Sequence, residues 1–212
     1  MEVKQSKFKL YFTHKEFLLA SLTSILFLAL SLVVNFYAGT YATEKASNPV
    51  TDIILSNTRA FDLGGIFVFG AIVFYIFLFI LFFFEPEKLP FTLDSIALFT
   101  IIRSIFVSLT HIGPFPSQSQ IPSTLLEKFS FGGDLFFSGH TGIPFLMALI
   151  FWKNRYLRLI FLASSVSFGI VVLLAHLHYS IDVLSAFFIT YTIFHISVYL
   201  FKKDRELFYR RL

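Results

Sequence analysis

The residues best suited to chemistry lie in short polar segments between long apolar runs. One segment reads HLHYSID and places His178 four residues before Asp182. On a helix this spacing puts both side chains on one face, within reach of each other. A carboxylate bonded to one imidazole nitrogen selects the tautomer and leaves the other nitrogen as a nucleophile or base. The pair is also typical of a helix start at a membrane surface, where its polar groups would only cap the helix.

A second segment reads FGGDLFFSGHT and leads into an apolar run. Gly132 and Gly133 would allow close backbone approach, and Ser138, Gly139 and His140 stand where a helix is expected to begin. A helix N-terminus presents unpaired N–H groups and a positive dipole, which suit a phosphate. The alternative is a glycine turn with a serine cap and an interfacial histidine.

Arg103 lies inside an apolar run, about ten residues or 15 Å from the expected outer end of its helix. A charge at such a depth is costly unless it faces the interior of a bundle and meets an anion. Asp94 is expected on the opposite face of the same helix. We therefore expect Arg103 to bind a phosphate. The alternative is a structural pairing with backbone carbonyls or with Asp134.

The elements that position these residues are membrane helices. Only 14% of the 212 residues are charged and 56% are hydrophobic, whereas about 25% of a soluble domain is charged. The apolar residues form blocks of about 20, the length at which an α-helix crosses about 30 Å of hydrocarbon. This composition excludes a water-soluble fold, and a formal net charge of +4 is too small to indicate nucleic acid.

We expect an all-α, polytopic protein with a single integral membrane domain over residues 1–212. Six transmembrane helices are predicted, at residues 17–38, 65–84, 93–112, 138–152, 159–175 and 182–201. His195, deep in the last of them, is expected to be a neutral, hydrogen-bonded residue inside the bundle.

The distribution of basic residues predicts the orientation, because Lys and Arg in short loops stay on the cytoplasmic side. Of the 17 Lys and Arg residues, all but Lys45, Arg59, Arg103 and Lys128 fall on the side of both termini. We therefore expect cytoplasmic tails at residues 1–16 and 202–212. The two histidine motifs would then face the exoplasmic side.

Two segments carry a resemblance. GGDLFFSGHT and AHLHYSIDV resemble the catalytic signatures of the sphingomyelin synthase branch of the type 2 phosphatidic acid phosphatase superfamily. RSIFVSLTHIGP, beginning at Arg103, is similar to the family's third-span segment. PVTDIIL, beginning at Pro49, is similar to its first-loop motif, although it lacks the second proline. Gly132 stands where that branch usually has cysteine.

The resemblance implies a six-helix bundle with an outward-facing site, a phosphohistidine intermediate and no metal or other cofactor. His140, His178 and Asp182 would be catalytic, and Arg103, Ser138 and Gly139 would bind the substrate phosphate. Asp134 and His176 would support them.

The expected function is that of a lipid phosphotransferase with a phospholipid donor and a lipid alcohol acceptor. A lipid phosphate phosphatase, in which water is the acceptor, is the alternative. The transferase branch fits better, because the chain lacks the arginine that phosphatases carry ahead of the last histidine and has no proline after Arg103.

Two further hypotheses stay open at this stage. His140, His176, His178 and Asp182 are residue types that suit zinc. A transporter or scaffold is the non-enzymatic alternative, in which Arg103 would line a pathway. The sequence leaves the oligomeric state open.

Overall fold

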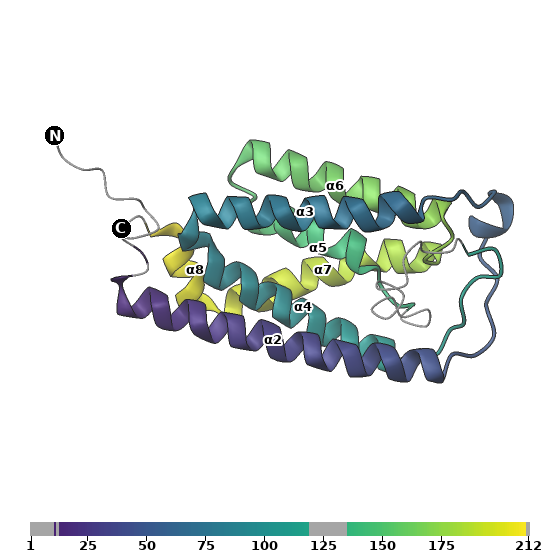
Figure 1. Cartoon of the computed structure of the whole chain (residues 1–212), viewed down its shortest axis with the longest axis horizontal. Coiled ribbons are helices and arrows are strands. Elements are labelled where there is room, and N and C mark those ends of the chain that lie inside the picture. Colours follow the sequence, from purple (N-terminus) through teal and green to yellow (C-terminus); the bar gives the residue numbers. More distant parts are fainter. Residues whose placement is uncertain (1–10, 12, 119–134, 211–212) are drawn as a thin grey trace.

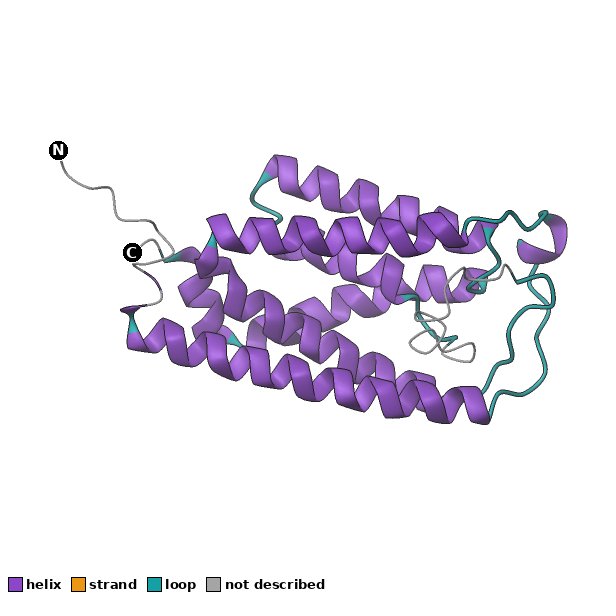
Figure 2. Cartoon of the chain, in the orientation of Figure 1, coloured by secondary structure: helices purple, strands orange, loops and turns teal. Residues whose placement is uncertain are grey.

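The structure, a computed structural model, describes residues 11, 13–118 and 135–210. Within these residues it is a bundle of seven α-helices and two short 3-10 helices, without a β-strand (Figures 1 and 2). The α-helices are α2 (Lys15–Glu44), α3 (Gly64–Phe84), α4 (Leu89–Leu109), α5 (Gly139–Ile150), α6 (Arg155–Leu174), α7 (Ser180–Leu200) and α8 (Lys202–Tyr209). The 3-10 helices are η1 (Leu55–Asn57) and η2 (Pro86–Lys88). The predicted all-α class is thus confirmed for the described residues.

Among the described residues, five segments are long and apolar enough to cross a membrane: α2, α3, α6, α7 and the continuous Pro86–Leu109, which contains α4. Helix α5 has only 12 residues, about 18 Å of helix against about 30 Å of hydrocarbon. It ends at Phe151, and the side chain of Asn154 then caps α6 by accepting from the Tyr156 and Leu157 N–H groups. The structure therefore supports five of the six predicted spans, and the fourth is a short apolar helix.

Helix α2 lies along α4 on one side of the bundle (Figure 1). Its buried residues are mainly small, namely Ser21, Ser24, Ser31, Ala38, Gly39 and Ala42. Small residues let membrane helices approach closely, so that dispersion contacts hold the pair. This packing brings the polar Asn35 of α2 next to Arg103 and Ser104 of α4.

Helix α5 packs against α4, α6 and α7. Gly142 allows this packing, because a Cβ atom at this position would lie 2.6 Å from the Phe99 ring of α4 and 2.9 Å from the Thr190 hydroxyl of α7. An aromatic cluster that includes Phe74, Phe99, Phe137 and Phe161 extends the core through edge-to-face ring contacts.

The two ends of the described chain meet at one end of the bundle, where the Tyr11 hydroxyl donates to the Arg210 carbonyl at 3.1 Å. Basic residues gather there as well. Lys88 Nζ donates to the Phe208 carbonyl at 2.6 Å, and Lys153 Nζ lies 4.2 Å from the Tyr209 ring centroid. The starts of α5 and α7, where His140 and the His178 pair lie, point toward the opposite end (Figure 1). This arrangement agrees with the predicted sidedness, and which side is cytoplasmic stays a prediction.

Candidate active site

His178 and Asp182 form a buried hydrogen-bonded pair at the start of α7. His178 Nδ1 lies 3.2 Å from Asp182 Oδ2, and the Tyr179 N–H donates to the same oxygen at 3.0 Å. Asp182 has no exposed surface, and His178 is 6% exposed. Since a carboxylate at Nδ1 favours the tautomer with the proton on that nitrogen, Nε2 is left with the lone pair. The predicted contact is thus present, but His178 lies two residues before α7 begins, so the pair spans the start of the helix and not one helix face.

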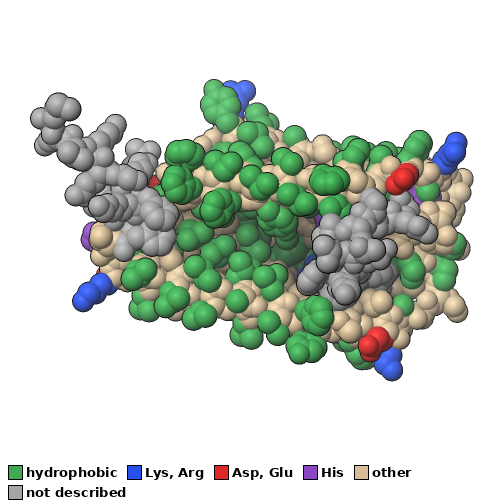
Figure 3. Space-filling model, viewed as in Figure 1, with side chains coloured by type: hydrophobic (Ala, Val, Ile, Leu, Met, Phe, Trp, Pro, Cys, Tyr) green, Lys and Arg blue, Asp and Glu red, His purple; other side chains and the backbone are tan. Residues whose placement is uncertain are grey.

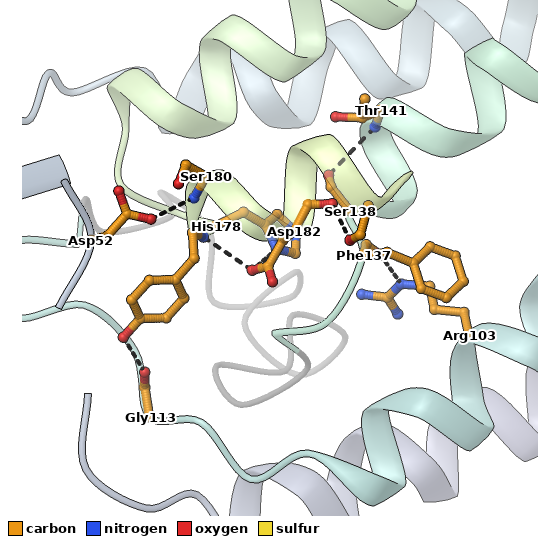
Figure 4. A network of polar contacts seen from close by, with 11 residues as sticks. Asp52, Arg103, Gly113, Phe137, Ser138, Thr141, His178, Ser180 and Asp182 are labelled. Atoms are coloured by element: carbon orange, nitrogen blue, oxygen red, sulfur yellow. Dashed lines mark hydrogen bonds and ion pairs between the residues drawn. The ribbon is translucent and has the colours of Figure 1, made fainter. Parts of the chain in front are cut away.

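The second motif is joined directly to this pair. Ser138 caps α5, its hydroxyl oxygen accepting from the Thr141 N–H at 3.4 Å. The backbone N–H of Ser138 donates to the Asp182 carbonyl at 3.1 Å (Figure 4). The N-terminus of α5 and the first turn of α7 are thus held together, and Gly139 and His140 stand in the first turn of α5.

Arg103 reaches the same place from α4 (Figure 4). Its Nε donates to the Phe137 carbonyl at 3.1 Å, and a Cβ atom on Gly139 would lie 3.6 Å from that nitrogen. Phe137 has a φ of 21°, a left-handed conformation that non-glycine residues rarely adopt and that is typical of functional sites. The guanidinium therefore lies against the N-terminus of α5. The bond to the Phe137 carbonyl is also the contact expected if Arg103 has only a structural role.

Arg103 lies nearer the end of its helix than the ten residues expected from the sequence. Helix α4 ends at Leu109, six residues after Arg103, or about 9 Å along the axis. The helix stops early because Thr110 is extended and the following residues pair with the loop between α2 and α3 (residues 45–63, the first outer loop of the predicted orientation). The Gly113 N–H, for example, donates to the Asn48 carbonyl. Arg103 is consequently closer to the outer surface than the sequence suggests.

His140 is partly buried between aromatic rings. Its imidazole stacks on Phe67 of α3 at a centroid distance of 3.8 Å and meets the edge of Phe168 of α6 at 5.7 Å. It interacts electrostatically with both His178 and Arg103. The structure therefore gathers the three predicted catalytic residues and Arg103 in one place.

His176 has other partners. Its Nδ1 lies 2.6 Å from the Ser117 hydroxyl and its Nε2 lies 3.3 Å from the Thr58 hydroxyl. Burial lowers the pKa of His176, although the charge of Asp52 partly opposes this shift. His176, in the loop between α6 and α7, thus contacts the first outer loop through Thr58 and the loop between α4 and α5, the second outer loop, through Ser117.

Some predicted features lie elsewhere or outside what is described. Asp134, Gly132 and Gly133 lie outside the described residues. In the described part of the chain, no group of three or more His, Cys, Asp or Glu residues is close enough to hold a metal ion. The zinc hypothesis therefore finds no ligand set there.

Two further polar residues contribute to the site region: Asn35, which the sequence did not single out, and Asp52, the aspartate of the first-loop motif PVTDIIL. Asn35 Oδ1 accepts from Arg103 Nη1 and from the Ser104 hydroxyl, both at 3.5 Å. Asp52 accepts from the N–H of Ser180, the first residue of α7, at 2.7 Å. A polar amide inside an apolar run is the signal that could have found Asn35.

The fold and site define an integral membrane protein with a two-histidine, one-aspartate centre beside an arginine. The family model described as PAP2 superfamily C-terminal matches residues 132–199, a segment that includes both histidine motifs. The match supports the PAP2 superfamily, whose members are phosphatases and phosphotransferases, and so an enzyme of this type acting on lipids. No curated protein and no solved structure matches the chain.

Proposed function

We propose that this protein is a membrane lipid phosphotransferase that moves a phospholipid headgroup to a lipid alcohol through a phosphohistidine intermediate. The observation that carries the proposal is the junction of the His178–Asp182 pair with the N-terminus of α5, beside Arg103. A nucleophile with its orienting carboxylate, a second histidine and a cationic anion site are the groups that such a transfer needs.

In the first step, His178 Nε2 attacks the phosphorus of the bound phospholipid. The bond between phosphorus and the diacylglycerol oxygen breaks as His140 gives its proton to that oxygen. Diacylglycerol leaves, and the headgroup phosphate stays covalently bound to His178. Asp182 stabilises the positive charge that develops on the imidazole through its bond to Nδ1.

In the second step, His140 is neutral and acts as a base. It takes the proton from the hydroxyl of an acceptor lipid alcohol, whose oxygen attacks the phosphorus. The bond between phosphorus and His178 Nε2 breaks, so both histidines return to their starting protonation states and a new phospholipid leaves.

The phosphoryl oxygens carry negative charge throughout. We assign their binding to Arg103, the Ser138 hydroxyl and the backbone N–H of Gly139, the first residue of α5. Phosphoryl transfer depends mainly on such positioning and charge stabilisation.

The apolar surroundings of the site suit a substrate with acyl chains. The face drawn in Figure 3 is hollowed between α3 and α4, and hydrophobic side chains line the hollow. Helix α3 packs mainly on α6 and η2. Phe67 of α3, whose ring stacks on His140, brings this apolar helix up to the histidine. Acyl chains lying there would leave the headgroup phosphate at the polar end.

The orientation of the protein follows from its basic residues. Both termini are cytoplasmic in this proposal, because most Lys and Arg residues fall on their side. The site then opens on the exoplasmic side, where it would meet lipids of the outer leaflet.

Product analysis tests the proposal. Purified protein is incubated with headgroup-labelled phosphatidylcholine or phosphatidylethanolamine, with and without added ceramide or diacylglycerol. A labelled phospholipid that forms only with an added alcohol supports the transferase. Labelled water-soluble phosphate alone would instead support the phosphatase alternative, in which water attacks the phosphohistidine.

A further inference from the structure

Both carboxylate oxygens of Asp52 accept hydrogen bonds, although the residue lies in a loop. It is 7% exposed. Its Oδ1 accepts from the N–H groups of Ile54 and Leu55 at 2.9 and 3.1 Å, and its Oδ2 accepts from the N–H of Ser180 at 2.7 Å (Figure 4). The first two bonds fix the carboxylate within its own loop. The third joins that loop to α7.

Ser180 lies between His178 and Asp182 as the first residue of α7, so a shift of its backbone would move both members of the pair. The first N–H groups of a helix have no partner within the helix, so an external acceptor keeps the first turn from fraying. A negative charge there also interacts favourably with the helix dipole. Burial opposes the ionisation of Asp52. Hydrogen bonds from the backbone of Ser180, Leu55 and Ile54 and from the Ser180 side chain outweigh it and hold the pKa of Asp52 below its usual value.

Tyr179 makes a second connection at the same turn. Its buried hydroxyl donates to the Gly113 carbonyl at 2.8 Å and accepts from the Val50 N–H at 3.2 Å. A Cβ atom on Gly113 would lie 2.1 Å from the Ser47 carbonyl, so only glycine fits where the two loops meet. The first and second outer loops are therefore both fastened to the turn that carries the catalytic pair.

We infer that Asp52 is a positioning residue for the transfer reaction, which holds the first turn of α7 through the Ser180 N–H and thereby aims His178 and Asp182 at the phosphate. This inference rests on the proposed function. Asp52 touches neither reacting group, and its effect passes through the helix backbone. A displacement of about 1 Å at a reacting group can lower a rate about 100-fold, so a loosened first turn is expected to slow the chemical step.

The test uses two variants that break the same bond from opposite sides. Asp52→Asn keeps the size of the side chain but removes its charge and one acceptor oxygen. Ser180→Pro removes both the N–H and the hydroxyl through which Ser180 contacts Asp52. Proline suits the first position of a helix, and Tyr179 before it has φ −70° and ψ 157°, a conformation compatible with a following proline. Glu44→Gln, which exchanges an exposed carboxylate for an amide near the start of the same loop, is the matched control.

The kinetic readout is the split between kcat and KM, measured with whichever labelled phospholipid the unmodified protein turns over. We expect Asp52→Asn and Ser180→Pro each to lower kcat about tenfold or more, with little change in KM. The double variant should lose no more than either single variant, because both remove one interaction. Additive losses, or an Asp52→Asn protein with unchanged kcat, would overturn the inference.

Hydrogen exchange separates this inference from the proposed function, since it needs no substrate. Faster exchange of the backbone amides of residues 179–183 in Asp52→Asn, with unchanged exchange in Glu44→Gln, is the expected result. Equal exchange in the unmodified protein, Asp52→Asn and Glu44→Gln would overturn the inferred role of Asp52, even if Ser180→Pro failed to fold. Absence of lipid turnover by the unmodified protein would instead count against the proposed function.

Discussion

The backbone N–H of Ser138 donates to the carbonyl of Asp182 at 3.1 Å, which ties the cap of α5 to the first turn of α7. One bond thus joins the helix that carries His140 to the helix whose first turn carries Asp182, the partner of His178. Because both ends of this bond are backbone atoms, side-chain substitutions leave it in place. Individual side chains of the site can therefore be replaced while the contact between α5 and α7 is kept.

Replacing the proposed nucleophile should abolish turnover. We expect His178→Ala to lower kcat by at least about a thousandfold, because no phosphohistidine can form. His195→Ala is the control, since it removes an exposed histidine from α7, the helix that His178 directly precedes. Acid-labile, base-stable labelling of the protein by a headgroup-labelled donor should disappear in His178→Ala and persist in His195→Ala. Labelling that survives the loss of His178 would refute its role.

The contribution of Arg103 to kcat/KM should depend on its guanidinium group and not on its charge alone. Lysine keeps the charge but cannot donate from Nε to the Phe137 carbonyl while also facing the phosphate. We expect Arg103→Lys to lower kcat/KM about tenfold or more. Arg59→Lys, at an exposed position of the first outer loop, should leave kcat/KM unchanged. Equal activity of the two variants would show that a single positive charge suffices.

Asn35 should support Arg103 from α2. Its amide oxygen accepts from Arg103 Nη1 and the Ser104 hydroxyl, both at 3.5 Å. A hydrogen bond of this kind contributes about 1 kcal/mol, so Asn35→Leu should lower kcat/KM by roughly fivefold. Val34→Leu changes the neighbouring lipid-exposed position and serves as the control. The loss should vanish when Arg103 is already replaced by Lys, and a persisting loss would mean that Asn35 acts independently.

Gly142 should limit stability. A Cβ atom at Gly142 would clash with the Phe99 ring at 2.6 Å, so Gly142→Ala is expected to destabilise the protein by about 1–3 kcal/mol. Gly65 in α3 has no atom within 4 Å of such a Cβ. Gly65→Ala should be neutral or stabilising by up to about 1 kcal/mol, because alanine is the better helix former. Melting temperatures in one detergent compare the two, and equal values would contradict the close packing of α5.

Acid should loosen the outer loops through His176. Burial lowers the pKa of His176 below the usual 6.5, so the unfolded chain binds a proton at a higher pH than the folded chain does. Stability contributed by neutral His176 is complete above about pH 6.5 and is lost progressively as the pH falls toward the folded pKa. The melting temperature should therefore fall between about pH 7.5 and 5.5.

The control for this pH effect is His176→Asn. His176 has a φ of 54°, and asparagine tolerates this left-handed conformation. The variant should show a smaller decrease in melting temperature over the same interval. An identical decrease in both proteins would assign the pH dependence to other groups.

Several features could be predicted from the sequence because they depend on neighbouring residues. The apolar blocks predict membrane helices, and five of the six are long enough in the structure to cross a membrane. The spacing of His178 and Asp182 predicts their contact, although His178 precedes α7 and the contact forms across the helix start instead of along one helix face. Ser138 is a cap for the same local reason.

Positions within the apolar helices were harder to predict. His195 lies on the exposed face of α7, beside Tyr191, and not inside the bundle as expected. In a span that is hydrophobic on every side, periodicity does not distinguish the face that meets lipid from the face that meets protein. The depth of Arg103 was misjudged because the end of α4 depends on how the following loop pairs.

By itself the sequence determined the membrane class, the helix content and the local geometry of the catalytic motifs, all of which depend on composition or on contacts within one turn. Only the tertiary structure decided that Asp52 holds the start of α7, that Asn35 contacts Arg103 and that His176 binds loop hydroxyls instead of the catalytic pair. These contacts join residues far apart in the chain. They depend on loop paths and helix packing, which no short sequence pattern encodes.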